Sequence, residues 1–216
     1  MASAQDRQGA GAELARARER QGADAETARA EDRRRVTDAK ALRALAHPLR
    51  VALLNHLMAF GPKTASECAQ AVGSTPSNCS WHLRNLALYR MVERVGSDDG
   101  RERPWRAAAT GFDYGDLDAG PAARAANQAL TTLWLDEDHR LAREYLRRHD
   151  QLDDAWRGTD GFSSYELRMS PEELGRLRDA LDALIRPYIG MTRDDPPPDA
   201  RPVHLSLLAF PRPEAI

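Results

Sequence analysis

Hydrogen-bonding side chains lie on one side of the helix that residues 75–88 are expected to form. At about 100° per residue, Cys79, Leu83 and Leu86 fall on one face and leave the polar residues on the other. In the major groove of DNA, an arginine can donate two hydrogen bonds to guanine and an asparagine can pair with adenine. The spacing therefore predicts chemistry directed at base edges. We expect the contacts to come from Thr75, Pro76, Ser77, Asn78, Ser80, Trp81, His82 and Arg84.

Each of these residue types is also common on an ordinary helix surface, so a helix used only for packing or for binding another protein is the alternative. A basic hairpin downstream favours nucleic acid. Residues 91–95 and 101–107 have the composition of two strands, with turn-forming residues between them. The hairpin could grip phosphates or enter the minor groove, or it could be merely solvated. The arginines expected to make these contacts are Arg101, Arg103 and Arg106.

Neighbouring elements must position this helix, and their start and stop signals are present. Thr64 and Glu67 have the spacing of a capping box for a short helix, which Gly73 would end. Thr75 and Pro76 then fit the cap and the first turn of the next helix. Further upstream, leucines recur at helical spacing and one proline divides them between two helices. Short helices joined by turns and followed by a hairpin predict a winged helix-turn-helix.

Composition bounds the remaining possibilities. The 216 residues carry a net charge of −2, so a nucleic-acid partner would have to meet a local basic surface. No apolar run reaches the roughly 18 residues of a membrane span. The first residues lack the apolar core of an export signal, and two cysteines cannot build a disulfide framework. We expect a cytoplasmic protein with double-stranded DNA as partner and no membrane partner.

Three segments of different character follow one another. Residues 1–37 contain few large aliphatic side chains and are expected to form a disordered or loosely helical arm. Residues 38–110 hold the predicted winged helix-turn-helix. Residues 111–216 are expected to form a helical or α+β region for dimerisation, with a ligand site as a further option. The predicted fold is therefore mainly α with a small β component.

The C-terminal region begins with apolar residues at helical spacing between 121 and 149. This long helix is expected to dimerise the protein through Leu130, Leu133, Trp134, Leu141 and Tyr145. Aromatic residues could also line a pocket for a small-molecule effector, although ordinary core packing is favoured. The pocket residues would be Trp134, Tyr145, Trp156 and Tyr165. Residues 162–169 and 203–210 have strand-like patterns, and we expect them to pair in a small antiparallel sheet.

Three motifs in this order resemble those of ArsR-like winged-helix regulators. Leu42-Arg-Ala-Leu-Ala-His-Pro-Leu-Arg50 is similar to their opening helix pair, and Ser80-Trp-His-Leu-Arg-Asn-Leu86 to their recognition helix. Gly100-Arg-Glu-Arg-Pro-Trp-Arg106 is similar to their wing. The resemblance covers roughly residues 38–108, and the tail has a weaker likeness to actinobacterial regulators. It implies a bacterial homodimer that binds a near-palindromic operator, commonly as a repressor. It also implies that His82 packs or touches a phosphate.

Other functions have less support. Many regulators of this resemblance sense metals, but Cys68 has no partner cysteine on its helix and Cys79 falls on the buried face of the next. His139 and His149 are turned apart by about 80° on an ideal helix. Catalytic motifs such as a Gly-rich phosphate loop are missing from the sequence. We therefore expect no metal, no cofactor and no enzyme. A protein-interaction module without DNA binding and a small-molecule-gated regulator remain as alternatives.

Overall fold

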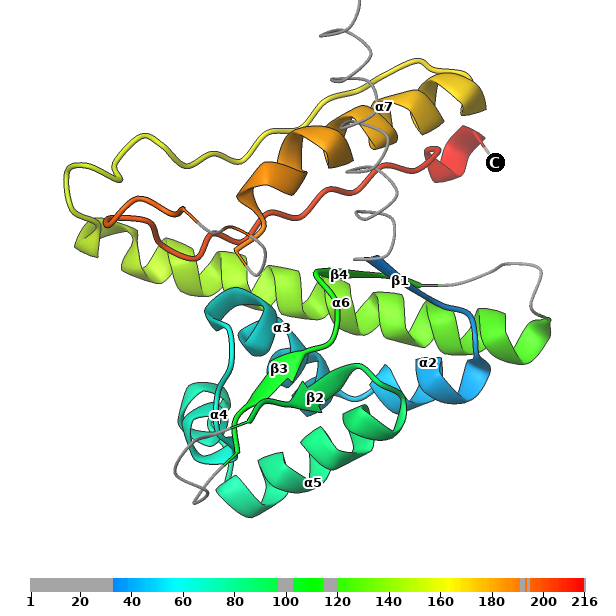
Figure 1. The fold of residues 1–216 in the computed structure, drawn as a ribbon. Coiled ribbons are helices and arrows are strands. Elements are labelled where there is room, and N and C mark those ends of the chain that lie inside the picture. The colour runs from blue at the N-terminus through cyan, green and yellow to red at the C-terminus, as the bar shows by residue number, and fades with distance from the viewer. Residues whose placement is uncertain (1–32, 97–102, 115–119, 191–192, 194, 216) are drawn as a thin grey trace, which may run out of the picture.

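The computed structural model describes residues 33–96, 103–114, 120–190, 193 and 195–215 (Figure 1). Helices predominate and the strands are short, so the predicted mainly helical fold is confirmed. In Figure 1 the long helix α6 (Pro121–Arg148) crosses the molecule, with helices α2 to α5 below it and the C-terminal segments above it. No helix among the described residues is long and apolar enough to cross a bilayer.

The helices of the lower body begin at residues that can cap them. They are α2 (Ala39–Leu45), α3 (Pro48–Phe60), α4 (Ala65–Val72) and α5 (Pro76–Leu88). Thr64 and Glu67 form the predicted capping box: the Thr64 hydroxyl accepts from the Glu67 amide (3.2 Å), and the Glu67 carboxylate accepts from the Thr64 amide (2.7 Å). Gly73 ends α4 in the left-handed conformation at φ 64°, which favours glycine.

The predicted hairpin is also present. Strand β2 (Val92–Arg94) pairs antiparallel with β3 (Trp105–Ala107). The backbone of Lys63, in the loop before α4, exchanges hydrogen bonds of 2.9 and 2.7 Å with that of Trp105. These bonds tie the hairpin to the segment that leads into α4, so the wing and the helix-turn-helix form one structural unit.

A second small sheet differs from expectation. Strand β1 (Arg33–Val36) pairs in parallel with β4 (Gly111–Tyr114). The sequence predicts a disordered or loosely helical arm for residues 1–37, but Val36 is only 4% exposed and belongs to the core. A strand this short, whose partner lies beyond the wing, leaves no local periodic signal. Residues 1–32 lie outside the described part of the chain, and the arm remains a prediction for them.

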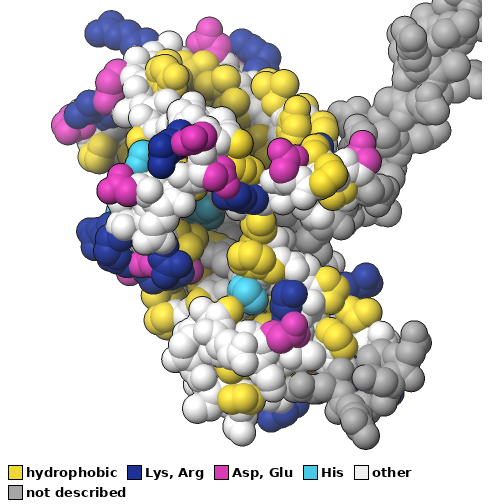
Figure 2. Space-filling view, turned by 90° about the vertical axis from the view of Figure 1, so that its left-hand side faces the viewer, with side chains coloured by type: hydrophobic (Ala, Val, Ile, Leu, Met, Phe, Trp, Pro, Cys, Tyr) yellow, Lys and Arg dark blue, Asp and Glu magenta, His cyan; other side chains and the backbone are white. Residues whose placement is uncertain are grey.

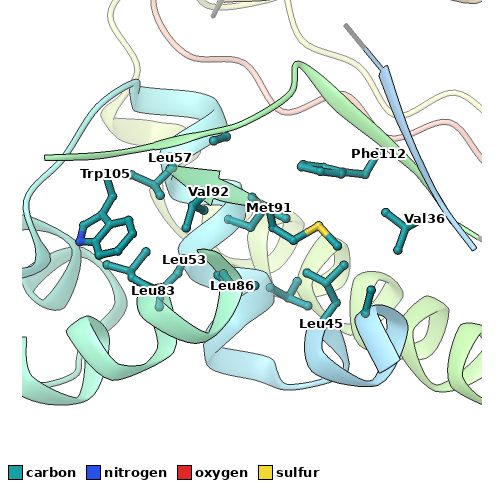
Figure 3. Close-up of a cluster of buried hydrophobic side chains, with 14 of the residues drawn as sticks. Val36, Leu45, Leu53, Leu57, Leu83, Leu86, Met91, Val92, Trp105 and Phe112 are labelled. Atoms are coloured by element: carbon teal, nitrogen blue, oxygen red, sulfur yellow. The ribbon is translucent and has the colours of Figure 1, made fainter. Parts of the chain in front are cut away.

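One apolar core fixes the lower body. Side chains from α3, α5 and the wing meet in its centre, while Val36 and Phe112 from the β1–β4 sheet close one end (Figure 3). Helix α6 covers the core with Ala123, Ala126 and Leu130. Full burial of one leucine contributes about 1.5–3 kcal/mol. The labelled central residues in Figure 3 are Leu45, Leu53, Leu57, Leu83, Leu86, Met91, Val92 and Trp105.

The C-terminal region contains the predicted long helix α6 and the predicted capped helix α7 (Pro171–Ile185). Ser170 caps α7 by accepting a hydrogen bond from the Glu173 amide (3.2 Å). Beyond Leu130, none of the described residues is buried. The short 3-10 helices of this region are η1 (His149–Gln151), η2 (Arg186–Tyr188) and η3 (Pro213–Ala215).

The expected antiparallel pairing of residues 162–169 with 203–210 is wrong. Both segments are extended, but no backbone hydrogen bond between described residues joins them. In Figure 1 they run in the same direction, because α7 carries the chain back to the side from which the first segment started. Two segments joined by one returning helix cannot lie antiparallel to each other.

Candidate nucleic-acid interface

Helix α5 is held by its apolar side. Cys79, Leu83 and Leu86 are all 0% exposed, and the helix packs against α3, α4 and β2. At its start, the Thr75 hydroxyl accepts a hydrogen bond from the Asn78 amide (3.2 Å), and a proline takes the first turn. Because one face is buried in the core and the start is capped, the orientation of α5 about its own axis is fixed. The side away from the core therefore presents a defined set of groups.

This outer face is open to solvent. Trp81 is 50% exposed, and Asn78 and Arg84 are exposed beside it. The Arg84 guanidinium donates a hydrogen bond to Ser80 Oγ (2.7 Å), and the side-chain amide of Asn78 (Nδ2) donates one to Ser74 Oγ (3.1 Å). These bonds hold the two side chains along the helix and reduce the entropy that a ligand would have to remove. The exposed members of the predicted set are Thr75, Pro76, Ser77, Asn78, Trp81 and Arg84, and Ser80 is half-buried.

A shallow hollow of about 350 Å³ adjoins this face where α4 meets the start of α5. Hydroxyl and guanidinium groups contribute to its lining, and no carboxylate does. Such a lining suits an anionic oxygen, as on the DNA backbone. The lining residues are Ala65, Pro76, Ser77, Ser80 and Arg84.

His82 is the exception among the predicted contact residues. Its ring is 5% exposed and lies 4.5 Å from the ring of His47, with Trp81 edge-on at 4.7 Å. Burial lowers the pKa of His82 below its usual value, and the nearby His47 and Arg50 lower it further. On an ideal helix His82 lies only about 60° from Cys79, at the edge of the buried face. That angle was the signal in the sequence for its burial.

The wing presents its arginines in different states. Arg103 is exposed, whereas Arg106 forms an ion pair with Glu93, its cross-strand neighbour (Nη2 to Oε1, 2.6 Å). Arg101 lies outside the described residues. Sequence reasoning missed Arg94, whose guanidinium stacks 4.3 Å from the centre of the buried Trp105 ring. The strand register, which places Arg94 opposite Trp105, is what brings the two together.

The charge around α5 is one-sided. Residues 68–92 contain no aspartate or glutamate, although the whole chain has a net charge of −2. In Figure 2, the lower part of the molecule, where α4 and the start of α5 lie, shows few acidic side chains compared with the upper part. Phosphate attraction acts within a Debye length of about 8 Å, so this local balance matters more than the net charge.

The residues predicted for dimerisation lie along one long helix. Leu130 is fully buried in the core of its own chain, and Leu133 and Trp134 pack partly against that core. Leu141 and Tyr145, further along α6, are half-buried. The outer half of α6 therefore has apolar surface that its own chain leaves partly uncovered.

The four aromatic residues predicted for an effector pocket have different surroundings. Tyr145 faces Phe162 at 6.3 Å between ring centres, while Trp156 lies under the Arg201 guanidinium at 5.2 Å. Tyr165 is 78% exposed. A second hollow, also of about 350 Å³, lies beside the wing and has none of the four in its lining. The effector pocket stays a prediction.

Several cysteine, histidine and carboxylate side chains that could have bound a metal are buried or paired with other groups. Cys68 and Cys79 are buried, and burial raises the pKa of the Cys68 thiol to about 11. Glu137 binds Arg140 (2.7 Å), and His149 lies 3.7 Å from Asp160. Within the described ranges, no three histidine, cysteine or carboxylate side chains gather in a way that could hold a metal ion.

Comparison with known proteins identifies the part of the chain that contains α5. The chain matches a family model described as a helix-turn-helix domain over residues 45–95. Residues 45–95 are a helix-turn-helix domain. With the β2–β3 hairpin this domain forms a winged helix-turn-helix, so the predicted fold of this part of the chain is confirmed. No curated protein matches the chain.

Solved structures with some similarity include a "possible transcriptional regulator for arsenical resistance". It is 28% identical, with 48% of this chain and 94% of that chain covered and a TM-score of 0.29. RV1404 from Mycobacterium tuberculosis is 17% identical, with 68% and 81% covered and a TM-score of 0.28. MepR, a transcription regulator of the Staphylococcus aureus multidrug efflux pump MepA, is 15% identical, with 67% and 78% covered and a TM-score of 0.25.

Proposed function

We propose that this protein is a sequence-specific transcription regulator that binds a near-palindromic operator as a homodimer and acts as a repressor. The observation that carries the proposal is the outer face of α5. This face is exposed, has no carboxylates and carries side chains that can hydrogen-bond to base edges. It lies in the same folded unit as the wing, which carries arginines.

In this proposal α5 enters the major groove with its first two turns. Arg84 donates to O6 and N7 of a guanine, and Asn78 pairs with an adenine. Trp81 covers a thymine methyl group or the sugar-phosphate wall. The wing adds contacts of a different kind, because Arg103 and its neighbours meet phosphates or the minor groove and carry little sequence information.

A homodimer would double this reading surface. Two symmetry-related recognition helices fit half-sites about one helical turn apart, roughly 34–36 Å, and the operator then mirrors the twofold axis of the protein. Helix α6 supplies the central contact in this proposal, through the partly covered apolar residues Leu133, Trp134, Leu141 and Tyr145.

The direct test is footprinting of the purified full chain on the DNA upstream of its own gene. The expected result is one protected site with two inverted half-sites whose centres are about 10 base pairs apart, or a multiple of that spacing. A shuffled duplex of equal length and composition is the control. Protection that does not differ between the two duplexes would contradict sequence-specific recognition.

The alternatives give other outcomes. A protein-interaction module would protect neither duplex at any concentration that keeps the chain folded. A small-molecule-gated regulator would protect the operator, and an effector at about 100 times its Kd would add about 2.7 kcal/mol to the stability of the free protein.

A further inference from the structure

The C-terminal arm, defined here as residues 162–169 and 203–210, leaves much apolar surface uncovered. Its large apolar side chains are between 41% and 78% exposed. A stable interface buries roughly 800 Å² on each partner, and large exposed apolar side chains such as these are the groups that can supply it. Patches of yellow side chains lie among charged and polar ones in the upper part of Figure 2. The large apolar side chains of the arm are Phe162, Tyr165, Leu167, Met169, Val203, Leu205, Leu207, Leu208 and Phe210.

The backbone of the arm is also unpartnered. Residues 162–169 and 203–210 are extended, and none of their amide or carbonyl groups takes part in a backbone hydrogen bond between described residues. Extended chain with free ladder groups and apolar side chains is a template for pairing with another strand.

Side chains nevertheless hold the two segments in place. Arg212, just past the second segment, lies 3.3 Å from the Glu166 carboxylate, and His204 lies 2.9 Å from Asp138 on α6. Both segments run in the same direction, with α7 as their connection (Figure 1). Because no backbone hydrogen bond between described residues joins the two segments, each keeps its ladder groups for an antiparallel strand from elsewhere.

We propose that a second copy of this chain supplies that strand. Residues 165–169 of the two copies pair antiparallel across a twofold axis, and each copy's residues 203–210 pair with the outer edge of the other copy's residues 165–169. The product is a four-stranded antiparallel sheet that spans the two subunits and has one α7 from each. A twofold axis makes such an interface self-complementary, which one sequence can satisfy.

The charges of the first segment select its register. With Leu167 on the twofold axis, Glu166 lies opposite Arg168 of the second copy, and Tyr165 lies opposite its Met169. The neighbouring even registers put Glu166 opposite Glu166 or Arg168 opposite Arg168, and like charges directly opposite are unfavourable. Only the first register joins opposite charges on one face and apolar side chains on the other.

This inference rests on the homodimer of the proposed function. It adds a second contact between the subunits to the one proposed for α6. The sheet would join the two subunits at the end of the molecule opposite the α5 helices. The wing and α5 would remain free, since α6 lies between them and the arm (Figure 1).

Disulfide cross-linking of the full chain tests the register. Leu167→Cys brings two thiols together on the axis, where directly opposed residues have Cα atoms about 4.5–5.5 Å apart, within disulfide range. Mild oxidation should convert most of the protein to a covalent dimer. Leu205→Cys is the matched control, because its copies would lie on opposite outer strands about 14 Å apart. The native Cys68 and Cys79 are buried and free.

A charge exchange gives a second readout without cysteines. Arg168→Glu should raise the dimer dissociation constant about tenfold by placing glutamates opposite one another, and Arg168→Glu with Glu166→Arg should return it to within about threefold. Rescue by the double variant is specific to pairing between copies, since a loss of folding in the single variant would not be repaired.

The outcomes separate the two proposals. If the wild-type chain is a dimer and protects its operator, but Leu167→Cys does not cross-link and the charge variants leave the dissociation constant unchanged, the intersubunit sheet is overturned and the regulator stands. If the wild-type chain is monomeric and protects no operator, the proposed function falls. Equal cross-linking of Leu167→Cys and Leu205→Cys would also overturn the register.

Discussion

Trp81 keeps half of its indole in water on the outer face of α5, while Leu83, two positions later, is fully buried. An exposed aromatic ring of this size is a large apolar surface without a partner in the free protein. Substitution of Trp81 therefore tests DNA binding, because this residue faces the proposed DNA. Substitution of Leu83 tests the stability of the fold, because this residue lies in the core.

The first prediction compares these two residues. Trp81→Ala should weaken operator binding several-fold and lower the unfolding free energy by less than Leu83→Ala does, because half of the residue is already exposed to water. Leu83→Ala should cost about 2–5 kcal/mol of stability through the cavity it leaves. Urea denaturation and fluorescence anisotropy measure the two effects. A large stability loss in Trp81→Ala with unchanged binding would assign the indole to the core.

The second prediction concerns His82, whose pKa burial lowers below its usual value near 6.5. Below that pH the unfolded chain binds a proton that the folded chain resists, so the unfolding free energy should fall as the pH is lowered. His82→Asn removes this titration. The stability of the wild type relative to His82→Asn should therefore decrease between pH 7.5 and 5.5, measured by urea denaturation. A difference that is independent of pH would contradict the assignment.

At the scale of elements, local sequence signals were enough to predict the helices of the helix-turn-helix. Capping residues such as Thr64 and Thr75, the glycine that ends α4 and the apolar spacing of α5 act within one or two turns of helix, so a single sequence displays them. Strand β1 could not be predicted in this way, because its ladder partner Gly111–Tyr114 lies far along the chain. The direction of residues 203–210 depends on how α7 returns the chain, which their own alternation does not encode.

The third prediction belongs to the wing. Arg103→Ala should weaken binding to operator and shuffled DNA by the same factor and should reduce the slope of log affinity against log salt by about 0.9, because one phosphate contact is lost. Arg176→Ala, an exposed arginine on α7, is the matched control and should change neither quantity. A loss confined to the operator would reassign Arg103 from phosphate contact to base recognition.

At the scale of the whole molecule, the burial pattern divides the chain at Leu130. The core of the described residues ends there, and the following residues have helices and extended segments without a core of their own. Ordering that much chain costs conformational entropy of about 1–2 kcal/mol per residue for the backbone, which exposed segments cannot offset. The second copy in the proposed dimer offers the missing contacts, so DNA affinity and the stability of the C-terminal arm should both depend on protein concentration.

The central claim is that the outer face of α5 reads sequence, and the affinity ratio between operator and shuffled duplex measures it most directly. The ratio is determined by anisotropy at fixed salt for the wild type and for Arg84→Ala. The account predicts that Arg84→Ala loses about 1–3 kcal/mol on the operator and much less on the shuffled duplex, so that the ratio collapses. An unchanged ratio, whether or not both affinities fall, would contradict it.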